Sequence, residues 1–427
     1  MDESSKLRLT EKYLKYPLLI LNVFGLWNQK TRPSIYFIYS FCVIFFTQYL
    51  YALFQIIYMI NVLGDIEKIA EASFLLLTQA TLCVKILLFT WKMRGVRHLT
   101  LFMDSEYFLP QKEAHWSIVN KSSFTQVGEF FLFAAMSTFT IALWAIFPLI
   151  DAAPEERVLP FKAWYPLPAE TSPYYEILYF YQIAGIWFSA LINVSIDRLS
   201  TAMTALGCAE VEILKDNLIN IEVYASEEMS IADKSDSFTK KTNLLKKALS
   251  VSYEEGIYAQ NVNNRMKSVD DNIEKRLNKC ICQHQHIVRF VGDVEANFHF
   301  GILAQFAASV GIICVTGLQI TLVNPASLKF VTKISYLIAM LAQLFFICRI
   351  GNDISFISAG LVEAAYGSPW IDRRRPFHTT LLIFMERLKQ PIITKAGFFF
   401  PLSLQTFVTL LRSSYSYFAV LQQLNSK

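Results

Sequence analysis

The feature that most constrains this chain is a series of apolar stretches, each long enough to cross a lipid bilayer. A transmembrane helix needs about 20 mainly apolar residues. Seven stretches meet that length, at residues 34–63, 69–91, 130–150, 177–196, 298–323, 330–348 and 396–424. The sixth is the weakest, because Lys333 lies near its start. The pattern predicts an all-α membrane protein, a bundle of seven transmembrane helices.

Composition argues against the common soluble classes. Of the 427 residues, 54% are hydrophobic and 17% are charged, whereas soluble domains carry about 25% charged residues. Ordinary soluble domains could not hide this much apolar surface from water. Disordered chains, coiled coils and nucleic-acid-binding domains are therefore disfavoured, and no nucleic acid is expected as a partner. Membrane lipid is the expected surrounding.

The basic residues predict how the bundle is oriented. Of the 39 lysines and arginines, 31 lie in the N-terminal segment and in the loops 92–123, 198–297 and 349–395. Lys and Arg gather on the cytoplasmic side of membrane proteins. We therefore expect a cytoplasmic N-terminus and, after seven spans, an extracellular C-terminus. This orientation is opposite to that of a G-protein-coupled receptor and disfavours a metabotropic mechanism.

No pattern of catalytic or metal-binding residues is present. The sequence lacks GxSxG, HExxH and a phosphate-binding loop. The run from Cys280 to His286 alternates Cys and His with other residues, but a helix would divide these side chains between two faces. We expect no enzyme activity, no metal and no cofactor.

Two amphipathic patterns lie in the predicted cytoplasmic loops. Their apolar residues recur at steps of three and four, as on one face of a helix. The first comprises Tyr258, Val262, Met266, Val269, Ile273 and Leu277, and the second Phe377, Leu381, Phe384, Met385 and Leu388. Both faces need a partner, and packing within the chain and assembly of subunits are equally compatible with the pattern.

The last span carries a mildly polar stripe. At about 100° per residue, its members lie within about 60° of Val420 around the helix. They are Thr409, Ser413, Ser416, Tyr417, Gln423 and Leu424. A hydrophobic constriction on such a stripe suits a pore that closes by dewetting. Small residues used for helix packing would give a similar stripe.

The end of the chain resembles a known family. The run TLLRSSYSYFAVLQQ, residues 409–423, is similar to the C-terminal signature of insect odorant receptors. The segments CRIGNDISFISAGLVEAAYGSPW and RPFHTTLLIFMERLKQPIITKAGFFFPLSLQTF resemble the region that precedes it, and Gly25-Leu26-Trp27 resembles a short element near the family's N-terminus. A gustatory receptor would show a TYhhhhhQF-type ending. The co-receptor Orco lacks the RSSYSYF form, so the chain looks like an odorant-tuning subunit.

The resemblance implies a function. Members of the family are odorant-gated, non-selective cation channels, and tuning subunits form heterotetramers with Orco in the plasma membrane of olfactory sensory neurons. The seventh helices surround the pore, and Val420 and Leu424 match the co-receptor's gate, with Gln423 beside them. The expected ligand is a small volatile odorant. The alternative is a gustatory-type receptor channel that works as a homotetramer.

The resemblance also divides the chain into functional regions. Residues 1–33 form the cytoplasmic N-terminal segment, 34–196 the first four spans with the ligand-binding bundle, and 197–297 a cytoplasmic loop with a helical anchor extension. Residues 298–348 form spans five and six, 349–395 the cytoplasmic anchor helix region, and 396–427 the pore-lining span.

In the family the odorant pocket lies within each subunit, in the outer half of the bundle. Apolar and aromatic walls with few polar groups suit a small volatile ligand. Packing and membrane-interface roles are the alternative for such side chains. The residues that we expect near the ligand are Phe74, Thr78, Met136, Thr140, Trp144, Tyr175, Tyr179, Gln182, Ile186, Thr316, Gln319 and Tyr336. Among these, Trp144 and Tyr179 are the first choices.

Overall fold

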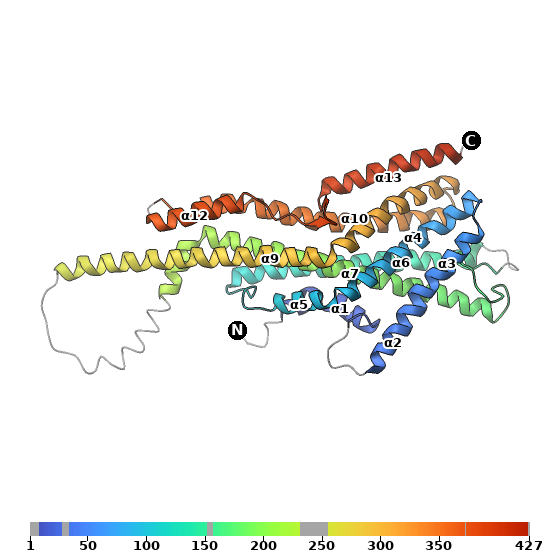
Figure 1. Cartoon of the computed structure of the whole chain (residues 1–427), viewed down its shortest axis with the longest axis horizontal. Coiled ribbons are helices and arrows are strands. Elements are labelled where there is room, and N and C mark those ends of the chain that lie inside the picture. Colours follow the sequence, from blue (N-terminus) through green and yellow to red (C-terminus); the bar gives the residue numbers. More distant parts are fainter. Residues whose placement is uncertain (1–7, 28–33, 152–156, 231–254, 372, 426–427) are drawn as a thin grey trace.

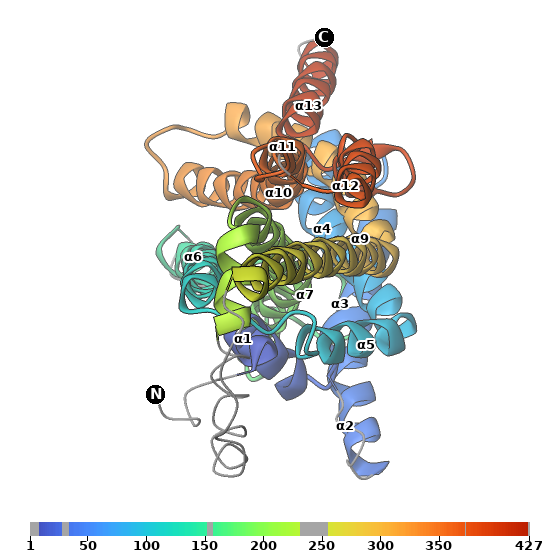
Figure 2. The same cartoon turned by 90° about the vertical axis from the view of Figure 1, so that its left-hand side faces the viewer.

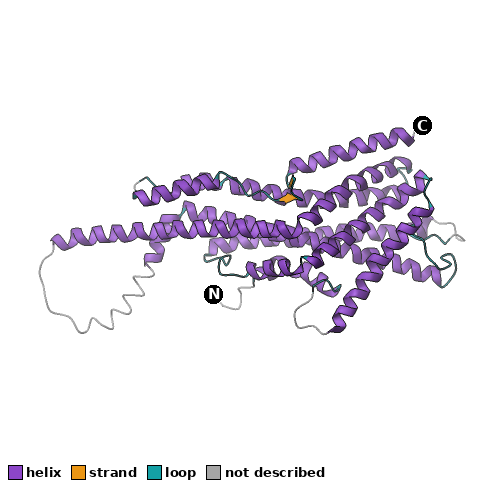
Figure 3. Ribbon diagram, viewed as in Figure 1, coloured by secondary structure: helices purple, strands orange, loops and turns teal. Residues whose placement is uncertain are grey.

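The computed structural model is almost entirely helical (Figure 3). It describes residues 8–27, 34–151, 157–230, 255–371 and 373–425. The helices before residue 231 include α1 Leu9–Val23, α2 Ser34–Ile44, the π-helical turn η2 Phe45–Tyr49, α3 Leu50–Asn61, α4 Ile66–Trp91, α5 Met93–Met103, α6 Glu113–Asp151 and α7 Tyr174–Ile219. After it come α9 Glu255–Leu322, α10 Leu328–Ala359, α11 Leu361–Tyr366, α12 Arg375–Leu388, β1 Lys395–Ala396, β2 Phe400–Pro401 and α13 Leu404–Asn425.

Six of the described segments are long and apolar enough to cross a membrane. They are the continuous run α2–η2–α3, and α4, α6, α7, α9 and α10. The all-α membrane bundle expected from the sequence is therefore confirmed. The seventh predicted span corresponds to α13, which has 22 residues but carries Arg412 and several Ser, Tyr and Gln residues. Its passage through the membrane stays a prediction.

Several helices are much longer than a bilayer requires. α9 has 68 residues, so it extends about 100 Å at 1.5 Å per residue, whereas the hydrocarbon core is about 30 Å thick. In Figure 1 α9 and α7 run from the bundle into a narrow extension, where α12 lies beside them. α13 ends at the opposite end of the bundle. The fold thus combines a membrane bundle with a helical extension on one side.

The N-terminal segment contains a helix that the hydropathy pattern did not predict. α1 buries Leu9, Tyr13, Leu14 and Leu21 against the main core, and the Tyr13 hydroxyl donates to the Val119 carbonyl at 3.3 Å. Polar residues on its other face hide this stripe from a hydropathy count. Residues 9–23 are therefore an integral part of the fold.

A glycine ends α1 and lets the chain turn sharply. Gly25 has φ +84°, a left-handed conformation that costs glycine little. The Leu26 amide then donates back to the Leu21 carbonyl at 2.7 Å. A Cβ at Gly25 would lie 2.5 Å from Ser40 Oγ, so α2 also leaves no room for a side chain. The sharp turn after α1 therefore explains why the Gly25-Leu26-Trp27 element begins with glycine.

The two amphipathic patterns are packed within the chain wherever their side chains are described. Ile273 and Leu277 of α9 are fully buried, and α12 buries Phe377, Leu381, Phe384 and Leu388. The side chains of residues 258, 262 and 266 lie outside the described part. Figure 2 looks along the extension and shows α12 beside α9. Intrachain packing therefore accounts for the described part of both stripes.

A small hairpin sets the start of α13. β1 and β2 pair antiparallel, with Lys395 opposite Pro401 and Ala396 opposite Phe400. The turn is tied to α9, since the Gly397 amide donates to the His299 carbonyl at 3.1 Å. On the other side Leu402 packs so closely on α10 that a Cβ at Gly351 would lie 2.2 Å from its Cβ. The hairpin therefore fixes where α13 begins against α9 and α10.

Candidate ligand cavity and pore helix

A small cavity lies inside the bundle, between α4, α6, α7 and α10. Its volume is about 80 Å³. Five of the residues expected near a ligand line it, namely Thr78, Thr140, Trp144, Ile186 and Tyr336. Their side chains come from four helices that are far apart in sequence. The bundle thus gathers these residues around one small space.

Aromatic rings form the outer wall of the cavity. The ring centroid of Trp144 lies 5.2 Å from that of Tyr336, 5.0 Å from Phe161 and 6.0 Å from Phe74. Phe74 supports the wall from behind, because it contacts two of the lining rings without lining the cavity. The hydroxyls of Thr78 and Tyr336 share a hydrogen bond. An apolar ligand would meet ring faces and one hydroxyl pair here.

Three other expected ligand residues bond to the backbone outside the cavity instead: two of them hold the loop before α7, and the third bonds to α6. Gln182 is fully buried: its carbonyl accepts from the Phe161 amide at 3.0 Å, and its Nε2 contacts the Tyr165 hydroxyl at 2.9 Å. Burial raises the pKa of Tyr165 further above its ordinary value. The Tyr175 hydroxyl donates to the Val158 carbonyl and that of Tyr179 to the Ala145 carbonyl. None of the three lines the cavity.

The remaining expected residues are also away from this cavity. Met136 packs beside a small cluster of Phe130 and Phe133. Thr316 and Gln319 of α9 are buried, and Gln319 donates to the Ala70 carbonyl. The Thr316 hydroxyl and the Gln319 side-chain carbonyl have no hydrogen-bond partner. Each of these two buried residues therefore has one side-chain oxygen that could still accept a hydrogen bond.

The floor of the cavity is polar, and the sequence reasoning missed it. It contains Gln79, Ser189, Asn193 and Gln343. Gln79 Nε2 donates to Gln48 Oε1 at 2.8 Å, and the Ser189 hydroxyl donates to the same oxygen at 2.9 Å. Ser189 and Asn193 follow Ile186 by three and seven residues, so they lie on the same face of α7. This spacing could have predicted them as cavity residues.

A buried ion pair lies directly beneath this floor. Lys85 of α4 is 2% exposed, and its Nζ lies 2.8 Å from Asp197 Oδ1 and 2.9 Å from Asn193 Oδ1. Gln343 of α10 donates to the other Asp197 oxygen. Asn193 and Gln343 therefore contact both the cavity and the ion pair, and the pair links three helices.

A second ion pair lies close by. Glu129 of α6 accepts from Arg198 Nη1 at 2.8 Å and also from Arg349 of α10. The Arg198 guanidinium lies 4.6 Å from the ring centroid of Phe346, a cation–π distance. Arg198 follows Asp197 directly in α7. The two pairs together join α4, α6, α7 and α10 below the cavity.

α13 turns its predicted stripe away from the rest of the chain. Thr409, Ser416, Val420 and Gln423 are exposed, and Ser413 is half-buried. The opposite side packs inward, with Ser414 buried and Phe418 close to Gly317 of α9. The Leu424 side chain lies outside the described part. The stripe is therefore part of the surface of α13 that its own chain leaves exposed.

Comparisons with known proteins place this architecture. A family model described as 7tm Odorant receptor matches residues 65–415, which include the cavity, the ion pairs and most of α13. The chain belongs to the insect odorant receptor family. This odorant receptor is 27% identical to Odorant receptor Or1 of Anopheles gambiae, over 96% of its own length and 95% of the relative's. It is 24% identical to Odorant receptor 46a, isoform A, of Drosophila melanogaster, over 97% and 99%.

Two further likenesses extend the comparison. The receptor is 24% identical to the Odorant receptor coreceptor of Anopheles gambiae, over 62% of its own length and 63% of the co-receptor's. Its fold matches that of the insect olfactory receptor OR5 from Machilis hrabei, solved in complex with eugenol. That match has a TM-score of 0.76 at 16% identity and covers 97% and 98% of the two chains. The receptor is a multi-pass membrane protein of this fold, and it is not an enzyme.

Proposed function

We propose that this receptor is the odorant-binding subunit of a non-selective cation channel that assembles as a tetramer with the co-receptor Orco. The observation that carries the proposal is the aromatic-walled cavity inside the bundle, together with the polar stripe of α13 that its own chain leaves uncovered. The proposal includes the plasma membrane of olfactory sensory neurons as the location and a cytoplasmic N-terminus; family membership and the basic loops support both.

The cavity suits a small volatile molecule. Sites for drug-sized ligands occupy about 300–1,000 Å³, far more than the roughly 80 Å³ present here. A ligand of a few heavy atoms would fit between Trp144, Tyr336 and Ile186, and a larger odorant would have to push the helices apart. An odorant that widens the cavity would bind more tightly to a bundle whose helices are further apart, and its binding would therefore favour that arrangement.

The subunit's need for Orco is tested by co-expression. We expect odorant-evoked cation current when this chain and an insect co-receptor are expressed together in oocytes. We expect no current from this chain alone, provided that surface labelling shows it at the membrane. Current from the chain alone would instead establish a self-sufficient, gustatory-type homotetramer. Current that requires added nucleotide or G-protein would point to a metabotropic receptor.

The cavity itself is tested at Trp144. Replacement with alanine removes the largest ring of the wall, so the odorant concentration for half-maximal current should rise by about tenfold or more. A pore opened independently of odorant should keep its conductance. Tyr179→Phe is the matched control, because that ring lies outside the cavity and only its hydroxyl is lost. If Tyr179→Phe shifts the response as much as Trp144→Ala, the odorant does not bind in this cavity.

A further inference from the structure

The hydroxyl pair in the wall of the bundle cavity has a defined direction of donation. Each hydroxyl carries a single proton. Thr78 donates its proton to the Phe74 carbonyl of the same helix at 2.9 Å. The proton in the hydrogen bond between Thr78 and Tyr336 must therefore come from Tyr336. The Tyr336 oxygen then has lone pairs but no further proton, so it can accept another hydrogen bond but cannot donate one.

This oxygen still has capacity for a ligand. Tyr336 is buried and lines the cavity, and among the residues that the structure describes its hydroxyl bonds only to Thr78. The rings of Trp144 and Phe74 on either side of it leave an apolar setting. A hydrogen bond in such a setting is electrostatically stronger than one in water. A ligand that donates a proton to Tyr336 would therefore bind more tightly than a ligand of the same shape that cannot.

The donors of the cavity do not separate one class of odorant from another. The Trp144 indole N–H and the Asn193 side-chain N–H groups have no hydrogen-bond partner within the described part of the chain. Any oxygen-containing ligand can accept from them, whether it is an alcohol, an aldehyde or an ether. The Ser137 hydroxyl also lines the cavity, and it can donate as well as accept. The Tyr336 oxygen is the group that requires a proton from the ligand.

We propose that the cavity prefers small odorants that carry a hydroxyl group, alcohols and phenols, because this hydroxyl donates to the Tyr336 oxygen. A protonated amine could also donate, but its charge would be costly to bury against apolar rings. The inference rests on the proposed function, in which the odorant binds in this cavity, and it adds the class of ligand. Tyr336 is then a residue that determines specificity.

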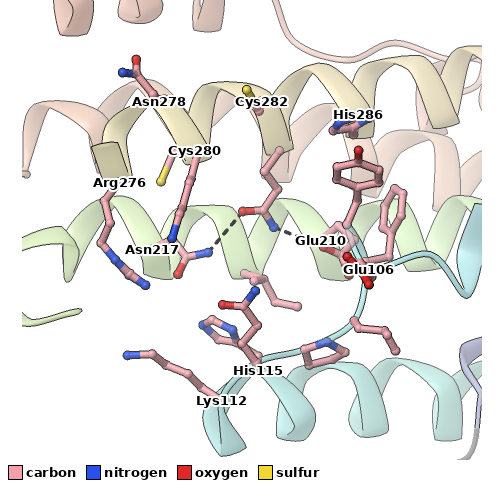
Figure 4. Close-up of a pocket in the computed structure, with 18 of the residues that line it drawn as sticks. Glu106, Lys112, His115, Glu210, Asn217, Arg276, Asn278, Cys280, Cys282 and His286 are labelled. Carbon is pink, nitrogen blue, oxygen red and sulfur yellow. Dashed lines mark hydrogen bonds between the residues drawn. The ribbon is translucent and has the colours of Figure 1, made fainter. Parts of the chain in front are cut away.

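A larger cavity in the helical extension could also hold a small alcohol. It has a volume of about 390 Å³ and lies between the segment 106–112, α6, α7 and α9 (Figure 4). A mainly apolar volatile suits it poorly, because charged side chains line it and would have to lose water, namely Lys112, Lys275, Arg276 and Lys279. Tyr107 belongs to the wall of this cavity. Tyr107→Phe therefore removes the same phenolic oxygen from the other site and serves as the matched control.

The test compares butan-1-ol, butanal and methyl propyl ether, which have the same number of heavy atoms, on oocytes that express the receptor with Orco. Longer members of each series are compared in the same way. We expect the alcohol to give half-maximal current at a concentration about three- to tenfold lower than the other two, the effect of one added hydrogen bond. In Tyr336→Phe the alcohol should lose this advantage, while the concentrations for the aldehyde and the ether stay nearly the same. Tyr107→Phe should keep it.

Thr78→Val provides a second variant with the opposite expected effect, and it serves even if Tyr336→Phe does not reach the cell surface. Valine has the shape of threonine but no oxygen, so the Tyr336 proton is no longer bound to Thr78 and can be donated to a ligand. Butanal should then evoke current at a lower concentration than in the wild type, and the advantage of the alcohol should shrink. A general loss of stability would instead shift all three odorants in the same direction.

The possible failures of this inference and of the proposed function are distinguishable. The inference is overturned if the wild type responds to the aldehyde or the ether as well as to the alcohol, or if it responds to other volatiles but to no alcohol. It is also overturned if Tyr336→Phe keeps the preference for the alcohol or if Tyr107→Phe removes it. Absence of current with any volatile, although both chains are at the surface, would overturn the proposed function and this inference with it.

Discussion

Asp197→Ala is expected to destabilise the receptor by about 3–5 kcal/mol, because it leaves the Lys85 ammonium buried without its counter-ion. Total stabilities of protein domains are about 5–15 kcal/mol, so the loss is a large share. The Lys85 side chain is 2% exposed, so its ammonium group is largely shielded from water. The midpoint of thermal unfolding in detergent and the amount of receptor at the cell surface should both fall sharply.

The double variant Lys85→Met, Asp197→Asn separates the loss of a charge from the loss of packing. It removes both charges and keeps a side-chain carbonyl for Gln343, so much of the stability should return. Glu386→Ala provides the control for ion pairs in general, because Glu386 and Lys389 are exposed and their pair should contribute less than about 1 kcal/mol. A wild-type unfolding midpoint for Asp197→Ala would show that the buried pair does not hold the helices together.

The position of this ion pair also bears on how odorant binding could reach the pore helix. Asn193 and Gln343 line the cavity of the bundle and bond to Lys85 and Asp197 beneath it. Gln343 belongs to α10, and α10 packs against α13, where the ring centroids of Phe345 and Phe407 lie 5.7 Å apart. A ligand that displaces the cavity floor would therefore move a helix in direct contact with α13.

Much of the fold could be predicted from the sequence, because long apolar stretches are the strongest signal that a chain offers. The helices that were missed are short and amphipathic. α1 buries Leu14 and Leu21 but exposes polar residues on its other side. Its average hydropathy is therefore too low to distinguish it from a loop. In the extension, the sequence predicted amphipathic helices near residues 258–277 and 377–388, but not that α6 begins at Glu113 and α7 continues to Ile219 as unbroken helices beyond their spans. Its helices carry an apolar stripe at steps of three and four, and a window that averages over 20 residues does not detect it.

The cavity could be predicted only in part, and the reason is physical. Hydropathy gives the depth of a residue in the membrane but not the direction in which it points. Lipid and protein interior are both apolar, so the side of a helix that faces a cavity differs little from the side that faces lipid. Tyr179 and Gln182 were chosen at the right depth, yet both bond to backbone carbonyls of α6 and the loop before α7. The polar floor around Asn193 lies deeper than the expected outer half.

The gate proposed at Val420 predicts a second large effect. Val420 is 55% exposed on the uncovered face of α13, where four such side chains would meet around a central axis in a tetramer. A ring of valines closes a narrow pore because water leaves an apolar constriction. Val420→Ala should widen and wet this constriction, so we expect channel opening at lower odorant concentrations, measurable current without odorant, or altered ion permeation in oocytes co-expressing Orco.

Val408→Ala is the matched control for the gate, since it makes the same chemical change on the same helix. Val408 is 43% exposed but lies twelve residues earlier, about 120° around α13 from Val420. It therefore points away from the stripe, and its replacement should leave gating and permeation near those of the wild type. Equal effects of the two variants would mean that α13 responds to any loss of side-chain volume. Unchanged gating and permeation in Val420→Ala would remove Val420 from the gate and leave the pore to be formed elsewhere along the stripe.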